Sequence, residues 1–407
     1  LIAEVFGKGE KQLHGYPGHP EIELALVRLY KVTANKKYLD LAYFFVLERG
    51  KKPVYFETEE TYRAKQFRIP GFNDFGLDYC QAHLPIREQK TAEGHAVRAL
   101  YLYTAMADLA YAYEDMELLD QCKILWQNIV QKRMYLTGSV GQAAYGERFT
   151  TDYDLPNNTN YSESCASIAL IFFSYRLFRI TGDACYMDVV EQVFYNTLLS
   201  GLALDGQHFF YVNPLESVPE IMHKNPTYRH IATGRKPWFN CACCPPNIAR
   251  TLASMGQYLY SRSDNTIYIN MFISNEAALA LDSGQVNLDL KAHYPDTEQI
   301  EIRVSPEKAK QSFRLAIRKP YYVSSFTISI NNEEVPYQEY KGYIVIERYW
   351  DREDQITMNY PMPFRFVYAN PKVRDDAHKL ALMKGPRVYC LEEVDNGSYL
   401  ANLKVDP

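Results

Sequence analysis

Apolar residues in the N-terminal part of the chain recur every three or four positions, which is the period of an α-helix with one buried face. Glycine, proline and asparagine interrupt this pattern at intervals, so the helices are predicted to come in pairs. The expected helices cover residues 21–33, 37–49, 93–114, 117–133, 161–181, 184–201 and 246–261.

The connections between these helix pairs are long, and residues 51–92 form a polar stretch interrupted by Pro53, Pro70 and Pro85. A connection of this length inside a compact domain is more often functional than idle. Paired helices are typical of an α/α toroid or an α-solenoid. Because no sequence repeat is visible and a solenoid would keep its connections short, we expect a toroid whose loops gather at one mouth.

The pattern changes near Ser263 to an alternation of apolar and polar residues, which is typical of strands. Short strands at this spacing indicate an antiparallel β-sandwich. The expected strands lie within residues 266–273, 286–290, 326–330, 343–346 and 355–358. We therefore predict a mainly α chain that ends in β structure, with an α/α domain at 1–263, a β-sandwich at 264–363, and a further β-domain or return strands at 364–407.

Composition narrows the function classes. A net charge of -5 without a basic tract argues against a nucleic-acid partner, and no apolar run approaches the roughly 20 residues of a membrane span. Eight cysteines spread unevenly over 407 residues do not resemble a disulfide framework. No signal peptide is visible, we expect both ends to be cuts in a longer protein, and the compartment is not indicated.

Three of the cysteines, Cys241, Cys243 and Cys244, fall within four residues and are followed by Pro245 and Pro246. Proline disfavours α geometry in the residue before it, so Cys244 and Pro245 are expected to be extended and the helix to begin at about Pro246. A helix N-terminus favours thiolate over thiol. This stretch alone leaves three interpretations open: a metal site, a nucleophilic cysteine, and small buried residues or a vicinal disulfide.

A metal site needs a fourth ligand, because zinc usually takes four. Glu163 and Cys165 are two residues apart and can converge only at a helix start, which residues 161–162 indicate. A site of one carboxylate and three thiolates could then form from Glu163, Cys165, Cys243 and Cys244. The alternatives are a solvated acid in the first helical turn for Glu163 and a buried core thiol for Cys165.

Three further side chains could take part in chemistry. Glu147 lies in a loop of small and aromatic residues, and it could hold a proton near neutral pH if it were partly buried; a surface ion pair with Arg148 is the alternative. His19 and His95 each follow a glycine at the same end of a predicted helix pair. They could bind a polar ligand at one mouth of the toroid, or they could be capping or core histidines. His83 is a weaker candidate.

Read together, these segments resemble glycoside hydrolase family 127, the bacterial β-L-arabinofuranosidases. The resemblance runs in order over most of the chain. It rests on Gly-His-Pro-Glu-Ile-Glu-Leu-Ala-Leu at 18–26, His-Leu-Pro-Ile-Arg-Glu-Gln at 83–89, Gly-His-Ala-Val-Arg at 94–98, Asp-Tyr-Asp-Leu-Pro-Asn at 152–157, Glu-Ser-Cys-Ala at 163–166 and Cys-Ala-Cys-Cys-Pro-Pro-Asn-Ile-Ala-Arg at 241–250.

The resemblance implies an (α/α)6 barrel followed by β-sandwich domains, and a retaining hydrolase that removes terminal β-L-arabinofuranosyl residues from a small carbohydrate or a plant glycan. It implies Cys243 as nucleophile and Glu147 as acid/base. The remaining roles are Zn2+ binding by Glu163, Cys165, Cys243 and Cys244, and substrate binding by His19, His95, Tyr211 and Glu191. The alternative from another class is a zinc-stapled carbohydrate-binding or scaffold protein without turnover. The β-domains could pair two copies into a homodimer.

Two departures from the family pattern are visible. Arg148 follows Glu147 where the family usually has a small residue, so we expect the pKa or the access of Glu147 to differ. The family also carries a long segment before the Gly-His-Pro-Glu motif, with the first barrel helices and another pocket histidine. We expect this chain to lack that segment.

Overall fold

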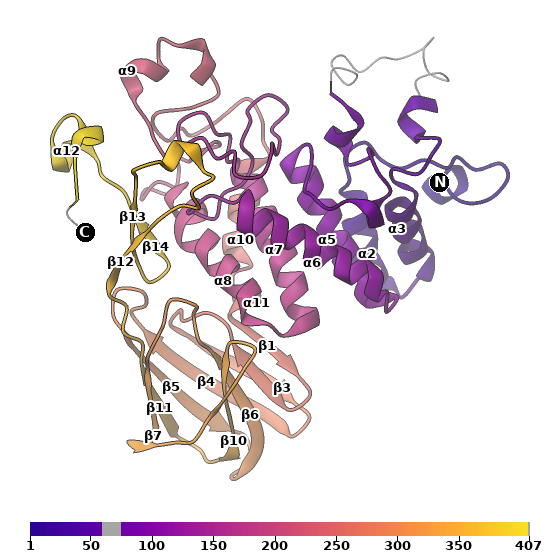
Figure 1. The fold of residues 1–407 in the computed structure, drawn as a ribbon. Coiled ribbons are helices and arrows are strands. Elements are labelled where there is room, and N and C mark those ends of the chain that lie inside the picture. Colours follow the sequence, from indigo (N-terminus) through magenta and orange to yellow (C-terminus); the bar gives the residue numbers. More distant parts are fainter. Residues whose placement is uncertain (59–74, 406–407) are drawn as a thin grey trace. The chain divides into compact units, whose positions relative to one another are not determined.

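The computed structural model describes residues 1–58 and 75–405. Contacts divide the chain into two compact units, Leu1–Tyr258 (unit 1) and Leu259–Pro407 (unit 2). Unit 1 is built of helices and unit 2 mainly of strands (Figure 1). Part of the predicted polar stretch at 51–92 lies outside the described residues; the remainder includes two 3-10 turns, Leu77–Cys80 and Ile86–Glu88.

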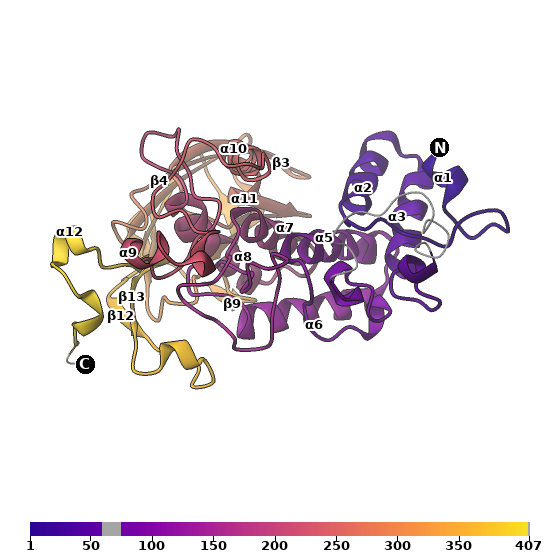
Figure 2. The ribbon, with the colours of Figure 1, turned by 90° about the horizontal axis from the view of Figure 1, so that it is seen from above.

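The main helices of unit 1 come in pairs, as the apolar period predicts, and the pairs follow one another in the view of Figure 2. Polar side chains start the second helix of each pair: Asn35, Asp115 and Asp183 each accept a hydrogen bond from a backbone N–H of the first turn. The pairs are α2 (Ile22–Thr33) with α3 (Lys36–Glu48), α5 (Ala96–Ala112) with α6 (Met116–Lys132), and α7 (Ser164–Thr181) with α8 (Ala184–Val193).

The first helices of successive pairs contact one another, so α2, α5, α7 and α10 (Cys244–Ala253) form one row. Helix α5 is buried over nearly its whole length. Helix α7 is long and apolar enough to cross a membrane by length and composition, but 72% of it is buried within the structure, as a core helix requires. Closure of the row into an (α/α)6 toroid remains a prediction.

Unit 1 also contains short elements in its connections. They are α1 (Ile2–Val5), a π-helical turn at Phe194–Leu198, α9 (Pro219–Met222) and a 3-10 turn at Pro226–Tyr228. Helix α11 (Gly256–Leu259) begins in unit 1 and ends at the first residue of unit 2.

The start of α10 corrects one prediction. Cys243 has φ -77° and ψ -48°, and the helix begins at Cys244, so Cys244 and Pro245 are helical and not extended as predicted. The two prolines occupy first-turn positions, where their missing N–H groups remove no intrahelical bond. Proline disfavours α geometry at Cys244, but Cys244 is fully buried where α10 packs against α7, and its sulfur lies 3.4 Å from that of Cys165. The helix also ends earlier than expected, and a strand begins at Tyr260.

Unit 2 contains a five-stranded and a six-stranded sheet, together with a small three-stranded one. The first has the order β1 (Tyr260–Ser263), β2 (Thr266–Ile269), β6 (Gln311–Arg318), β10 (Tyr343–Trp350), β9 (Gln338–Tyr340). The second has the order β3 (Asn275–Leu281), β4 (Gly284–Ala292), β5 (Gln299–Pro306), β11 (Asp354–Asn359), β7 (Thr327–Ile330), β8 (Glu333–Glu334). The third has the order β12 (Phe364–Val367), β13 (Ala381–Lys384), β14 (Arg387–Tyr389). The remaining elements are 3-10 turns at Arg374–Asp376 and Leu400–Asn402 and α12 (Glu393–Asn396).

All five predicted strand segments contain a strand, and each alternates buried and exposed residues or lies buried on both faces. Within residues 260–363, strands β1, β3, β5, β6, β8 and β9 were not predicted. The expectation of wholly antiparallel sheets is wrong at one pair, because β2 and β6 run parallel. The chain leaves the first sheet after β2, builds β3, β4 and β5 of the second sheet, and returns as β6 in the same direction.

Gly94 is a backbone constraint that places the N-terminus of α5. Its φ is +72°, and a Cβ there would lie 2.2 Å from the carbonyl oxygen of Asp78. Gly182, which follows α7, has a similar φ of +67° but nothing within 4 Å of a Cβ. A side chain at either position would strain a left-handed backbone, but only at Gly94 would it also clash with fixed backbone atoms. Comparing the two positions therefore measures the two effects separately.

We expect Gly94→Ala to lower the free energy of unfolding by more than about 2 kcal/mol and Gly182→Ala by about 1 kcal/mol, because only the first adds a clash to the left-handed strain. Urea denaturation of both variants measures the difference. Equal losses in the two variants would contradict the clash at Gly94.

Candidate metal centre and active site

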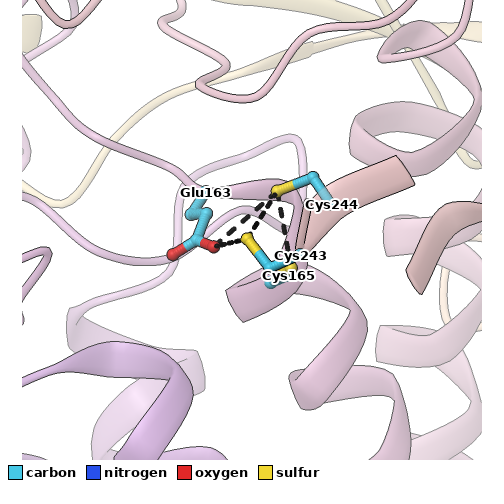
Figure 3. A group of neighbouring side chains, drawn as sticks. All are labelled: Glu163, Cys165, Cys243 and Cys244. Carbon is cyan, nitrogen blue, oxygen red and sulfur yellow. Dashed lines mark hydrogen bonds between the residues drawn. The ribbon is translucent and has the colours of Figure 1, made fainter. Parts of the chain in front are cut away.

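Glu163, Cys165, Cys243 and Cys244 come together in unit 1, with one ligating atom from each lying within 4.8 Å of the others (Figure 3). The sulfurs of Cys165 and Cys244 are 3.4 Å apart. Oε1 of Glu163 lies 3.5 Å from the sulfur of Cys243 and 3.7 Å from that of Cys244. All four cysteines of this region, including Cys241, are free thiols. The predicted convergence is confirmed.

Two helix starts build this cluster. Glu163 is the extended residue before α7, with ψ 137°, and Cys165 lies in the first turn of that helix. The extended backbone turns the Glu163 side chain back toward Cys165, which a continuous helix would not allow. A backbone bond from Ser164 N–H to the Tyr211 carbonyl holds this start in place. Cys243 and Cys244 open α10, which packs against α7.

The chemistry of the cluster fits a thiophilic divalent cation. Glu163 is 3% exposed, and its Oε2 is buried without a hydrogen-bond partner among the described residues. Burial, and then the charges of Glu147 and Cys243, raise the pKa of Glu163 well above its ordinary value. An ionised carboxylate buried against three sulfurs is costly unless a cation joins them. The alternative of a solvated Glu163 is wrong, and the buried Cys165 belongs to the cluster.

Cys243 differs from the other two thiols. It is half-buried, and its sulfur lies 2.8 Å from the hydroxyl of Tyr211. Hydrogen bonds from Cys165 and Cys244, followed by the one from Tyr211, lower the pKa of Cys243 far below that of an ordinary thiol. The pKa values of Cys165 and Cys244 are raised. The negative charge of the cluster therefore gathers on the sulfur that is accessible.

Glu147 is held at both oxygens. Oε2 lies 2.9 Å from Nε2 of His95, and Oε1 accepts a hydrogen bond of 2.8 Å from the hydroxyl of Tyr161. Burial raises the pKa of Glu147, but the bonds from His95 and Tyr161 outweigh it, so the pKa lies below its ordinary value. Arg148 pairs with Asp78. The alternative of a surface pair between Glu147 and Arg148 is therefore wrong.

The two histidines expected at one mouth do lie together, with ring centroids 6.1 Å apart. His95 precedes α5, where its Nδ1 accepts from the Arg98 N–H while Nε2 faces Glu147. It is thus a capping residue and a partner of the candidate acid at once. Glu191 lies in α8 and is 1% exposed, and its role in a pocket stays a prediction. His83 is partly buried and stays a weak candidate.

Tyr161 and Asn247 lie at the site but were not predicted as site residues. Tyr161 binds Glu147, and the amide of Asn247 donates to the sulfur of Cys165 at 2.9 Å. The only signal for either residue was its position, two residues before Glu163 and within the segment 241–250.

Comparison with known families agrees with this arrangement. The family model described as "Beta-L-arabinofuranosidase, GH127 catalytic domain" matches residues 1–257. The GH127 middle-domain model matches residues 266–362, and the model of the family's C-terminal domain matches residues 364–407. The chain belongs to glycoside hydrolase family 127.

Two relatives illustrate the similarity. A "Non-reducing end beta-L-arabinofuranosidase" of Bifidobacterium longum subsp. longum is 39% identical over 98% of this chain. The crystal structure of a GH127 β-L-arabinofuranosidase from Geobacillus stearothermophilus T6 superposes with a TM-score of 0.94, at 45% identity over 98% of this chain. The chain spans 61% of the length of the first relative and 63% of the second.

His19 offers a test of the electrostatics at this mouth. Burial, and then the charges of Arg98 and His95, lower its pKa from 6.5 to about 4. The folded chain therefore keeps His19 neutral where the unfolded chain takes up a proton. The free energy of unfolding should fall as the pH drops from 6.5 to about 4.

We expect His19→Gln to remove this loss, so that the variant gains stability relative to the wild type as the pH is lowered through that window. Urea unfolding at several pH values measures the difference. His223→Gln, at an exposed histidine, is the control and should show no such trend. A constant difference between wild type and His19→Gln would contradict a neutral His19.

Proposed function

We propose that the chain is the catalytic part of a retaining glycoside hydrolase that removes terminal β-L-arabinofuranosyl residues from a small carbohydrate or a plant glycan. The observation that carries the proposal is the ionisation-prone sulfur of Cys243 beside Tyr211, with the carboxyl group of Glu147 held nearby by His95 and Tyr161. The β-L-arabinofuranosidase activity for which the two relatives are named supports this substrate class.

We propose Zn2+ for the cysteine cluster, because three thiolates and a carboxylate form a ligand set that zinc favours. Glu163, Cys165, Cys243 and Cys244 would hold the ion. When bound, it keeps the thiols deprotonated at neutral pH and offsets the charge of the buried carboxylate.

Cys243 and Glu147 divide the chemistry between them. The sulfur of Cys243 attacks the anomeric carbon while the bond from that carbon to the leaving oxygen breaks, and Glu147 gives the leaving oxygen its proton. Glu147 then takes a proton from water, the water oxygen attacks the anomeric carbon, and the carbon–sulfur bond breaks to restore the thiolate. Two displacements at one carbon retain its configuration.

Glu147 must hold a proton before the first displacement, although its pKa is lowered in the free site. Its side chain is 35% exposed. A sugar ring bound over the carboxyl group would displace water, and desolvation raises the pKa of a carboxyl group. Substrate binding would thus prepare the acid. We propose that the bound sugar contacts His19, His95, Tyr211 and Glu191.

We also propose that the β-domains could pair two copies of the chain into a homodimer.

We expect Cys243→Ser to lower kcat/KM for an aryl β-L-arabinofuranoside by at least about 1,000-fold, because a serine hydroxyl is a far weaker nucleophile than a thiolate. Cys390→Ser is the matched control: Cys390 is exposed, belongs to unit 2 and stands outside the four-residue cluster, so turnover in this variant should stay near that of the wild type.

Wild-type rates in Cys243→Ser would remove Cys243 from the mechanism. A wild-type protein that binds zinc and is folded but shows no turnover would instead favour the zinc-stapled carbohydrate-binding protein.

We expect Glu147→Ala to lose about 100-fold to 10,000-fold in turnover, because the second step lacks its base. Azide needs no base, so it should restore turnover and release β-L-arabinofuranosyl azide with retained configuration, as nuclear magnetic resonance of the product would show. Azide should not restore Cys243→Ser. An azide product of inverted configuration would contradict the two-displacement route.

A further inference from the structure

Asn247 has no part in the proposed mechanism, yet its side chain contacts the cysteine cluster at the sulfur of Cys165. It lies in the first turn of α10, is 8% exposed, and directs its amide at Cys165. Nδ2 is 2.9 Å from the sulfur of Cys165 and 3.4 Å from the hydroxyl oxygen of Tyr101. A candidate ligand therefore receives a hydrogen bond from a buried neutral donor.

Tyr101 and Arg250 hold this amide in its orientation. The hydroxyl oxygen of Tyr101, on α5, also accepts a bond of 3.1 Å from Nη2 of Arg250. The guanidinium of Arg250 lies 5.3 Å from the ring centre of Phe172 on α7. With Arg250 and Asn247 both donating to the same oxygen, the nitrogen end of the amide faces Tyr101 and Cys165 together. Helices α5, α7 and α10 thus share one polar network behind the cluster.

This hydrogen bond would offset part of the negative charge of the cluster. Three thiolates and a carboxylate carry more negative charge than a divalent cation neutralises, and N–H or O–H donors to the sulfurs offset the excess. Two sulfurs have such donors: Cys243 has the hydroxyl of Tyr211, and Cys165 has the amide of Asn247. Tyr211 thus bonds the sulfur of Cys243, the proposed nucleophile, and Asn247 bonds the sulfur of Cys165, a proposed metal ligand.

We infer that Asn247 is a positioning residue whose amide holds the Cys165 sulfur toward the metal, stabilises its thiolate and so sets the metal affinity of the cluster. This inference rests on the proposed zinc site and gives Asn247 no contact with the sugar. A merely structural role would leave metal binding unchanged in any variant that still folds.

The test measures metal binding without substrate. Zinc affinity is obtained by competition with a chromophoric chelator for the wild type, Asn247→Leu, Asn247→Asp and Thr251→Val. Thr251 is the matched control, because it is buried one turn further along α10 and its hydroxyl donates to the backbone carbonyl of Asn247 rather than to a sulfur of the cluster. Circular dichroism establishes that each variant is folded.

We expect Asn247→Leu to bind zinc about 10-fold to 100-fold more weakly than the wild type, as is typical when a donor to a metal ligand is lost. Asn247→Asp, which is nearly isosteric, should bind still more weakly because it sets an anion against the thiolate. Thr251→Val should keep the wild-type affinity. In the cobalt-substituted protein, the thiolate-to-cobalt charge-transfer band should move to lower energy in Asn247→Leu and stay in place in Thr251→Val.

Wild-type affinity and an unmoved cobalt band in folded Asn247→Leu would overturn the inference. If that variant does not fold, the same result in Asn247→Asp would overturn it. A wild-type protein that binds no zinc would instead overturn the proposed metal site itself, and intact zinc binding with full turnover in Cys243→Ser would overturn only the proposed nucleophile. The failures are therefore distinguishable.

Discussion

The approach of two helix starts, those of α7 and α10, is the constraint on which the candidate site depends. It brings Glu163 and Cys165 against Cys243 and Cys244, although nearly eighty residues of chain separate the two pairs. Packing of apolar helix faces sets this approach, and packing is indifferent to charge. Helix packing therefore buries the four side chains of the cluster, and burying their negative charges costs free energy unless a cation is bound. A metal ion would turn this cost into a crosslink between the helices.

A helix start also positions Glu147 and His95, the other candidate residues of the site. Gly94 lets the backbone at Asp78 approach the start of α5, and His95 follows immediately. His95 then meets Glu147, whose loop returns to α5 through a bond from the Ala96 N–H to the Glu147 carbonyl. The proposed nucleophile Cys243 and the proposed acid Glu147 are thus held at the starts of two different helices, α10 and α5. Helix ends suit this task because their unpaired backbone and side-chain groups are free to bind.

Much of the fold could be predicted from the sequence because its periods are local. The helix pairs of unit 1 and five strand segments follow from the spacing of apolar residues, and the convergence of Glu163 with Cys165 follows from a helix start. Local rules failed where a distant contact competes with them. Cys244 is helical despite the proline after it, since α10 packs on α7, and β2 meets β6 in parallel only because three strands of another sheet intervene.

The sequence by itself determined which groups were available: the crowded cysteines, the Glu-x-Cys segment, and the family that these motifs indicate. Only the tertiary structure decided what each group faces. In the folded chain Glu147 bonds His95 and Tyr161 rather than Arg148, and the amide of Asn247 donates to the sulfur of Cys165. The physical reason is that residue type and period are encoded within a few positions. Burial, hydrogen-bond partners and pKa arise instead from segments that meet only when the chain has folded.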